Sequence, residues 1–395
     1  MEGAELVKWK KPRLSRWVVF VGLMVIGTYA ASTLLDLSIP APTGDHAVGR
    51  VSWVWVDDSR PESHTPDAHD ARSVPVRVWY PAQPGTGQPA GYVEDLAVIE
   101  AGLKESGELS WLETLGLRMV RNHSLQGAAV EASEEGFPVL LLSPGNATNV
   151  GFYSALAEDL ASKGYVVIGI DHAFQVAAVR VEDGSVAVYD RLMDAGPESV
   201  RPKIEERVAD MDFVLERIRE GTGGIEFLAP SLDLARIGVL GHSNGGISAA
   251  EMCRADTAIA ACLNIDGLAA GGPFGYEQDA PAPEQPFMFL TKETSIHDVL
   301  HSRFEAAGAG AVRAVVPVAE HGDFTDGGML EPDVNPFSNN ARSVVVSSRA
   351  LVSAFFDQWL KEPRSRPFSG LEIPSDVYIN VYPLEGNRPI PAAAP

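Results

Sequence analysis

Short, unbroken apolar runs alternate along this chain with longer stretches in which apolar residues recur at helical spacing. Such runs are typical of strands buried on both faces, and the helical spacing is typical of helices that cover them. The runs predict strands at Phe137–Ser143, Tyr165–Ile170, Ile237–Leu240, Ile259–Ile265, Phe287–Leu290 and Ala314–Val318. The spacing predicts helices at Tyr153–Lys163, Lys203–Arg219 and Val344–Leu360. This alternation predicts an α/β fold with a mostly parallel central sheet and helices on both faces.

The pattern differs in the part of the chain before residue 137. Val51–Val56 and Val74–Tyr80 alternate as strands do, and we expect them to pair antiparallel at one edge of the sheet. A polar loop from Asp57 to Arg72 is predicted between them. Residues 93–131 predict amphipathic helix, while residues 173–202 predict an irregular segment beside a pocket.

The N-terminal end of the chain has the pattern of a membrane-targeting segment. Residues 17–35 carry no charge. The preceding residues, 1–16, are basic near this stretch, and Asp36 is the first charged residue after it. This pattern predicts either a cleaved signal peptide or a membrane-anchor helix, with the rest of the chain extracytoplasmic. The chain would touch the membrane through residues 17–35 if they stay uncleaved. A linker at 36–48, a folded domain at 49–362 and a proline-rich tail at 363–395 are predicted to follow.

Composition narrows the classes of partner. The 395 residues include 53 acidic and 31 basic side chains, a formal net charge of −22, which argues against nucleic acid as a partner. Cys253 and Cys262 are the only cysteines, and their spacing is not that of metal ligands. They form either one disulfide or two buried thiols. We therefore expect neither a metal nor a cofactor.

The sequence Gly241-His242-Ser243-Asn244-Gly245 is the strongest chemical signal. It matches G-x-S-x-G, and it stands between a predicted buried strand and a predicted helix. In this context the glycines permit a tight turn that exposes the serine, and the helix N-terminus favours negative charge there. Ser243 is the predicted nucleophile; the alternative interpretation is a structural turn with an incidental serine.

A nucleophilic serine needs a histidine base and a carboxylate that orients it. In α/β-hydrolases the chain order is serine, acid, histidine, which leaves His321, in a loop after the last predicted parallel strand, as the preferred base. His297 and His301 remain as less suitable candidates, at helical spacing. Asp266 and Glu293 each end a strand and are the candidate acids. Chain order rejects His46, His64, His69, His123 and His172 as the base, and His242 is set aside by its place in the turn. Asp323 and Asp326 lie too close to His321 in sequence to be first choices as the acid.

The negative charge on a reacting carbonyl requires two backbone N–H donors. Asn244, directly after the nucleophile, is expected to supply one. The turn Gly145-Asn146, after Phe137–Ser143, is expected to supply the other. Because all these groups follow the carboxyl ends of strands, we expect them to meet at one rim of the sheet.

Several stretches together resemble the platelet-activating factor acetylhydrolases of the α/β-hydrolase type, over roughly residues 50–360. They are LLLSPGNATNVGFYSALAEDLASKGYVVIGIDH, ARIGVLGHSNGGISAA, CLNIDG and VAEHGDFTD, with DDSRPE and ARSVPVRVWYPA upstream. The resemblance implies an α/β-hydrolase domain at 49–362, selects Asp266 over Glu293 as the acid, and matches Asn146 and Asn244 to the oxyanion-hole donors. Two positions depart from the family: Asn244 replaces a bulky apolar residue, and Pro144 replaces a histidine of some members.

The resemblance implies hydrolysis of short-acyl esters, sometimes on phospholipids. We predict a serine carboxylic ester hydrolase with the triad Ser243, Asp266 and His321, acting on a small-molecule or lipid ester without a cofactor. The alternatives are a polyester- or dienelactone-type general esterase, an acyl transferase, and a membrane-anchored non-catalytic protein of the same fold. Oligomeric state is not predicted.

Overall fold

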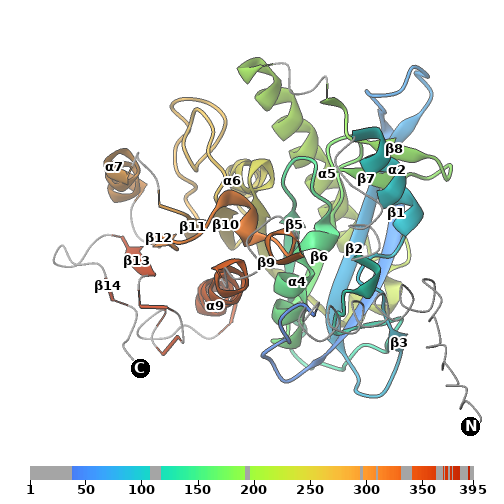
Figure 1. Cartoon of the computed structure of the whole chain (residues 1–395), viewed down its shortest axis with the longest axis horizontal. Helices are drawn as coiled ribbons and strands as arrows, with labels where there is room; N and C mark the ends of the chain where they lie inside the picture. Colours follow the sequence, from blue (N-terminus) through green and yellow to red (C-terminus); the bar gives the residue numbers. More distant parts are fainter. Residues whose placement is uncertain are drawn as a thin grey trace, which may run out of the picture. The chain divides into compact units, whose positions relative to one another are not determined.

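The computed structural model describes residues 38–106, 117–191, 196–293, 297–307, 310–330, 340–361, 368, 370–371, 374–375, 377–382 and 390–391. Ile39–Pro395 forms one compact unit (Figure 1). The hydrophobic helix predicted at residues 17–35 lies outside the described residues. Within the part that is described, no helix is both long enough and apolar enough to cross a bilayer.

The described strands form one large mixed sheet with a parallel centre. Its order is β14-β13-β12-β11-β10-β9-β5-β6-β2-β1-β4-β3. The parallel strands are β6 (Val166–Ile170), β5 (Phe137–Ser143), β9 (Leu232–His242), β10 (Ala261–Ile265), β11 (Phe287–Thr291) and β12 (Ala311–Val315). The predicted α/β class with helices around a sheet is thereby confirmed.

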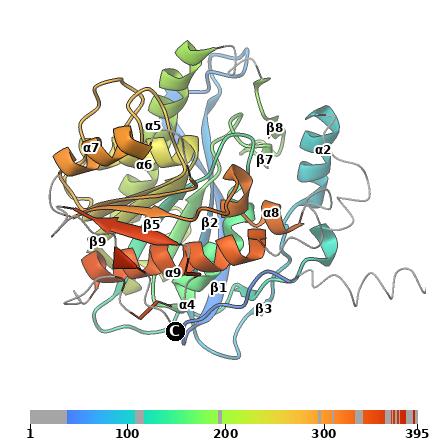
Figure 2. The same cartoon turned by 60° about the vertical axis from the view of Figure 1, so that its left-hand side comes forward.

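Helices cover both faces of this sheet, which explains why its central strands are apolar throughout. One face packs on α5 (Val200–Glu220), α6 (Asn244–Ala255) and α7 (His297–Ala307). The other packs on α4 (Ser154–Ser162) and α9 (Asn340–Leu360). Figure 2 shows the two layers on opposite sides of the strands. Every residue of β5, β6, β10, β11 and β12 is buried, as strands enclosed by two helical layers must be.

The N-terminal strands pair antiparallel as predicted, but they are longer and lie further inside the sheet. β1 (Ala47–Pro61) and β2 (Ala71–Ala82) extend into the segment predicted as a loop at 57–72, with a register shift between Asp57 and Pro61. They are not the edge, because β4 (Ser124–Gln126) and β3 (Gln88–Pro89) continue the sheet beyond β1.

Short strands account for most of the other differences from the sequence-based expectations. Within 93–131, helix is found at α2 (Leu96–Ser106) and at 117–119, whereas β4 is a strand; residues 107–116 lie outside the description. The segment 173–202 holds the hairpin β7 (Ala178–Arg180) and β8 (Val186–Val188), as well as the start of α5.

The ends of the folded domain also differ. In the predicted tail at 363–395, β13 (Tyr378–Val381) pairs antiparallel with β12, and β14 (Ile390–Pro391) pairs with β13. Much of the predicted linker at 36–48 packs on the fold: Ile39 is buried, and the Thr43 N–H donates to Asp159. β12 ends before the predicted Val318, since Pro317 has no N–H to continue the ladder.

Candidate active site

The parallel strands carry the candidate site at their carboxyl ends. Asn146 follows β5, Ser243 follows β9, Asp266 follows β10, and His321 follows β12 after a short connection. Neighbouring parallel strands end at one rim of the sheet, so the topology alone brings these four segments together.

Ser243 occupies a strained turn between β9 and α6. Its backbone has φ 56° and ψ −125°, outside the regions that a residue with a side chain normally adopts. Both flanking glycines are required by space: a Cβ on Gly241 would overlap the Gly245 carbonyl, and one on Gly245 would overlap the Ser143 carbonyl. The Ser243 N–H donates to Ile265 O (2.9 Å), so β10 holds the turn in this conformation.

Asp266 and His321 are joined by a short hydrogen bond. The distance from His321 Nδ1 to Asp266 Oδ2 is 2.6 Å, and Thr291 Oγ1 donates to Asp266 Oδ1 at 2.6 Å. Burial of Asp266 acts to raise its pKa, but the hydrogen bonds from His321 and Thr291 outweigh burial and lower the pKa below its ordinary value. The carboxylate is therefore ionised at neutral pH. An ionised partner at Nδ1 requires a proton there, which leaves Nε2 free to accept one.

Ser243 and His321 are both accessible to a substrate. Ser243 is half-buried, and the His321 side chain is 49% exposed. Among the hydrogen bonds of the described residues, none joins Ser243 Oγ to His321. Hydrogen bonds between nucleophile and base are often long without substrate and tighten on binding.

The two candidate oxyanion-hole donors have unused N–H groups. Asn244 is the first residue of α6, where a helix N–H has no partner within the helix. The Asn146 N–H donates no hydrogen bond within the part of the chain that is described. In contrast, the Gly145 N–H donates to Tyr153 Oη (3.0 Å), so it is already used.

Tyr153, His242 and Arg207, which were not selected from the sequence, bind the segments that carry the candidate site residues. Tyr153 Oη lies 2.9 Å from His242 Nδ1, and His242 Nε2 lies 3.1 Å from the His321 carbonyl. Arg207, on α5, donates to Pro144 O (2.7 Å) and to Asn146 Oδ1 (3.1 Å), so it fixes the turn after β5. The position of His242 next to the serine was a sequence signal for such a role, whereas nothing near Tyr153 or Arg207 in sequence pointed to one.

A second Ser-His-Asp arrangement lies behind this turn. Ser143 Oγ is 2.9 Å from His172 Nε2, and His172 Nδ1 is 2.9 Å from Asp210 Oδ2. All three side chains are completely buried, so no substrate reaches them. Burial lowers the pKa of His172 to about 4 and keeps the ring neutral. This arrangement therefore braces the ends of β5 and β6, and the chain order that rejected His172 as base agrees with its position.

The other candidate acids are engaged elsewhere. Glu293 is exposed and accepts from Tyr378 Oη (2.9 Å). Asp323 accepts from the Glu320 N–H (2.9 Å). Asp326 accepts from Tyr92 Oη (3.0 Å) and the Ala155 N–H, and burial raises its pKa to about 8.

Of the two less suitable histidines, His301 lies on α7 and contacts Tyr382 Oη (2.9 Å). His297 begins the same helix. Among the described residues, no three His, Cys, Asp or Glu side chains are grouped as metal ligands would be.

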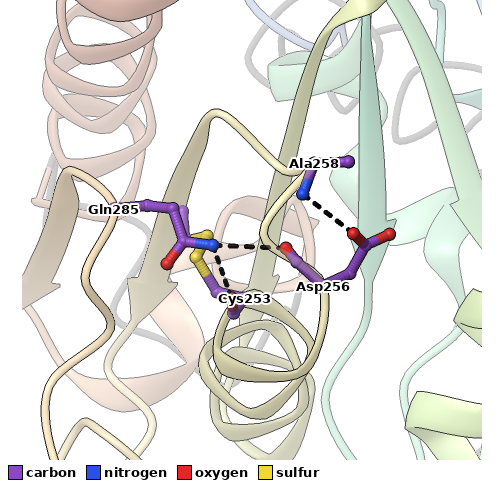
Figure 3. Close-up of a disulfide and its surroundings, with 5 residues drawn as sticks. Cys253, Asp256, Ala258 and Gln285 are labelled. Carbon is purple, nitrogen blue, oxygen red and sulfur yellow. Dashed lines mark hydrogen bonds between the residues drawn. A yellow bond between two sulfur atoms is a disulfide. The ribbon is translucent and has the colours of Figure 1, made fainter.

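The two cysteines form a disulfide between the helix that follows Ser243 and the strand that precedes Asp266. It joins Cys253, near the end of α6, to Cys262 on β10, the strand that carries Asp266 (Figure 3). Gln285 donates to the carbonyls of Cys253 (2.6 Å) and Asp256 (3.2 Å), which satisfies acceptors at the helix C-terminus. The helix behind Ser243 is thus tied to the next strand of the sheet.

Comparison with known proteins confirms the resemblance predicted from sequence. Residues 32–187 match the family model described as "Platelet-activating factor acetylhydrolase, isoform II". An Arthroderma benhamiae protein named "Probable 1-alkyl-2-acetylglycerophosphocholine esterase" is 33% identical over 132 residues, 33% of this chain and 32% of that protein. The platelet-activating factor acetylhydrolase of Gallus gallus is 25% identical over 190 residues, 40% of this chain and 44% of that protein. The matched stretches thus span a third to less than half of these relatives.

A solved structure extends the similarity over most of the fold. The ferulic acid esterase from Streptomyces cinnamoneus superimposes with a TM-score of 0.68 and 28% sequence identity. The alignment covers 86% of this chain and 98% of that one. The similarity to an esterase agrees with the α/β-hydrolase fold class.

Proposed function

We propose that this chain, a relative of the platelet-activating factor acetylhydrolase family, is a serine carboxylic ester hydrolase that works through an acyl-enzyme. The observation that carries the proposal is the hydrogen bond between Asp266 and His321 at the rim of the sheet that presents Ser243. A buried carboxylate bound to a half-exposed imidazole, beside a serine in a strained strand-to-helix turn, is the arrangement of a general base and its nucleophile.

In the proposed first step, Ser243 Oγ attacks the ester carbonyl carbon, and His321 Nε2 takes the hydroxyl proton. The carbonyl oxygen becomes an oxyanion, which the N–H groups of Asn146 and Asn244 stabilise together with the N-terminus of α6. The intermediate then collapses: the bond to the alcohol oxygen breaks, His321 returns the proton to that oxygen, and the acyl group stays on Ser243.

The second step releases the acid. A water molecule attacks the acyl carbon while His321 Nε2 takes its proton, and the same two N–H groups stabilise the second oxyanion. Collapse breaks the bond to Ser243 Oγ, which recovers its proton from His321. Asp266 keeps the proton on Nδ1 throughout and stabilises the imidazolium of each intermediate. Ester and water thereby yield acid and alcohol.

For the substrate, we propose a short-acyl ester, including phospholipid esters. The Arthroderma benhamiae protein is named as a probable 1-alkyl-2-acetylglycerophosphocholine esterase and the Gallus gallus protein as a platelet-activating factor acetylhydrolase. The Streptomyces cinnamoneus enzyme is named as a ferulic acid esterase. The half-buried Asn244 beside the nucleophile makes the proposed site more polar at this point than an apolar residue would. A general esterase is the second candidate, and the similarity to the ferulic acid esterase favours it.

We also propose an extracytoplasmic location. The disulfide between Cys253 and Cys262 is of a kind that persists in oxidising compartments, and the charge pattern around residues 17–35 agrees with export.

The test uses the Ser243→Ala variant and a substrate panel. Replacement of the nucleophile should lower kcat on p-nitrophenyl acetate by on the order of 10⁴-fold or more and abolish labelling by a fluorophosphonate. Ser347→Ala is a control, because the Ser347 hydroxyl lies in the core on α9 and donates within its own helix, to Ser343 O (2.8 Å). Near-normal turnover by Ser243→Ala, or a wild-type chain that no fluorophosphonate labels, would refute the proposal.

The panel then separates the candidate substrates. It compares p-nitrophenyl esters of increasing acyl length, a 1-alkyl-2-acetylglycerophosphocholine and methyl ferulate. Preference for the acetyl phospholipid supports the first candidate, whereas equal or higher kcat/KM on the other esters supports the general esterase. An added alcohol that captures the acyl group in preference to water would indicate acyl transfer instead.

A further inference from the structure

We infer that Tyr153 and His242 are positioning residues that lock the three catalytic segments of the proposed esterase to one another; the inference rests on the proposed function. Tyr153 precedes α4, and His242 is the last residue of β9, 89 positions away. Neither is accessible to a substrate, since Tyr153 is 1% and His242 is 4% exposed. Any effect they have on the reaction must therefore pass through the groups they bind.

Their hydrogen bonds form one chain across the site. The Gly145 N–H donates to Tyr153 Oη (3.0 Å), Tyr153 Oη contacts His242 Nδ1 (2.9 Å), and His242 Nε2 contacts the His321 carbonyl (3.1 Å). Gly145 belongs to the turn after β5, His242 to the turn of the nucleophile, and His321 to the loop of the base. These hydrogen bonds thus link the three segments to one another directly.

The direction of each hydrogen bond follows from what each atom can do. A carbonyl oxygen only accepts, so His242 Nε2 carries a proton and donates to His321 O. Burial lowers the pKa of His242 to about 3, so the ring is neutral and Nδ1 has no proton. Tyr153 must then donate its hydroxyl proton to Nδ1 and accept from the Gly145 N–H. Burial raises the pKa of Tyr153, which keeps that proton in place.

This arrangement has two consequences for the proposed reaction. First, the Gly145 N–H is directed at Tyr153, so the next donor along the turn, the Asn146 N–H, is left for the oxyanion. Second, His242 binds the His321 carbonyl while Asp266 Oδ2 binds His321 Nδ1, and the His242 and His321 rings lie tilted to each other with centroids 4.6 Å apart. The imidazole is thus fixed by its carboxylate and by its own carbonyl.

The Tyr153→Phe variant tests the inference, because it removes one oxygen and keeps the ring. The Gly145 N–H and His242 Nδ1 then lose their hydrogen-bond partner. As a result, the Asn146 N–H and the His321 ring are no longer held in position relative to each other. We expect kcat and kcat/KM on p-nitrophenyl acetate to fall by the same factor, about 10- to 100-fold, with KM unchanged, as when an oxyanion donor is displaced.

The matched control is Tyr165→Phe. Tyr165 is also buried in the same apolar cluster, and its hydroxyl donates to Asp357 Oδ1 (2.7 Å), a residue of α9. Both variants lose a tyrosine hydroxyl from one cluster, so a purely structural role predicts equal effects on activity. We expect Tyr165→Phe to keep kcat within about threefold of the wild type.

A second measurement does not depend on any variant folding. In the wild-type chain, ¹⁵N NMR of the histidine rings at pH 7 should show His242 neutral, with its proton on Nε2. A charged ring or the opposite tautomer would overturn the inference, as would an active Tyr153→Phe variant with full kcat. A wild-type chain without esterase activity would instead refute the proposed function, and this inference with it.

Discussion

The pair Asp266–His321 gives the sharpest prediction, through the variant Asp266→Asn. This change keeps the size of the side chain and replaces one carboxylate oxygen by an amide NH₂. Its effect depends on which amide atom faces His321. Asp266 Oδ1 lies near the backbone N–H of Lys292 (3.4 Å), which can only donate, so the amide oxygen of the new side chain should take that position. Its NH₂ group then faces His321 Nδ1, where Asp266 Oδ2 accepts in the wild type at 2.6 Å.

That orientation reverses the tautomer of the base. An NH₂ group at Nδ1 requires Nδ1 to accept, so the ring proton moves to Nε2, the nitrogen that accepts the proton of Ser243 in the proposed reaction. Thr291 favours the same orientation, because its hydroxyl donates to Asp266 Oδ1 (2.6 Å) in the wild type and can still donate to an amide oxygen there. We expect kcat to fall about 10⁴-fold, equivalent to ~5 kcal/mol of transition-state stabilisation.

The assay is the hydrolysis of p-nitrophenyl acetate at pH 7, with the release of p-nitrophenol followed in the first turnover and at steady state. Glu293→Gln is the control, because Glu293 was the competing acid in the sequence and its carboxylate is bound to Tyr378 (2.9 Å). We expect Glu293→Gln to keep full activity. A folded Asp266→Asn variant that retains more than a tenth of wild-type kcat, or a large loss in Glu293→Gln, would refute this assignment of the acid.

Two further predictions concern stability. Burial raises the pKa of Asp326 to about 8, so the folded chain holds a proton there that an unfolded carboxyl releases near pH 4. The contribution of this proton to the free energy of unfolding is complete below pH 4 and is lost as pH rises toward 8, by at most about 1.4 kcal/mol per pH unit. In urea unfolding, the free energy of unfolding of Asp326→Asn should therefore depend less on pH between about 4 and 8 than that of the wild type. An equal pH dependence in the two chains would contradict the prediction. Replacing Cys253 and Cys262 together by alanine should lower the free energy of unfolding by about 2–3 kcal/mol, and a reductant should then destabilise only the wild type. Two free thiols in the unreduced wild type would contradict the disulfide.

The sequence predicted those parts of the fold that depend on local pattern. β5 and β6 are continuous apolar runs, and a run of this kind is buried wherever it lies in a parallel sheet. β4, β7 and β8 were missed because each has three residues, too few for alternation to be recognised. β13 was missed because its partner, β12, is more than sixty residues earlier, and the pairing depends on a tertiary contact that no local pattern encodes.

The candidate site divides in the same way. Ser243 was indicated by a motif and its strand-to-helix context, and His321 by chain order, whereas the choice of Asp266 over Glu293 needed the resemblance to a family. Tyr153 and Arg207 could not be selected, because a buried tyrosine and a helical arginine are ordinary residues in sequence. Their roles exist only through partners at distant positions, and that information enters with the fold.

Strain in the backbone connects the fold to the proposed chemistry. Ser243, Asp266 and Ala147 have φ angles of 56°, 50° and 52°, each a conformation that costs on the order of 1–3 kcal/mol for a residue with a side chain. In each case the N–H is held by a neighbouring segment: Ser243 by Ile265 O (2.9 Å), Asp266 by Leu290 O (2.7 Å) and Ala147 by Gln175 O (2.9 Å). Ser243, the proposed nucleophile, therefore depends on the strand that precedes Asp266, and Asp266, the proposed acid, depends on the next strand of the sheet. Since Ser243 and Asp266 each need the neighbouring strand in place, the proposed active site depends on the pairing of β9, β10 and β11, and a loss of pairing between β10 and β11 should disturb Asp266 before it disturbs the core.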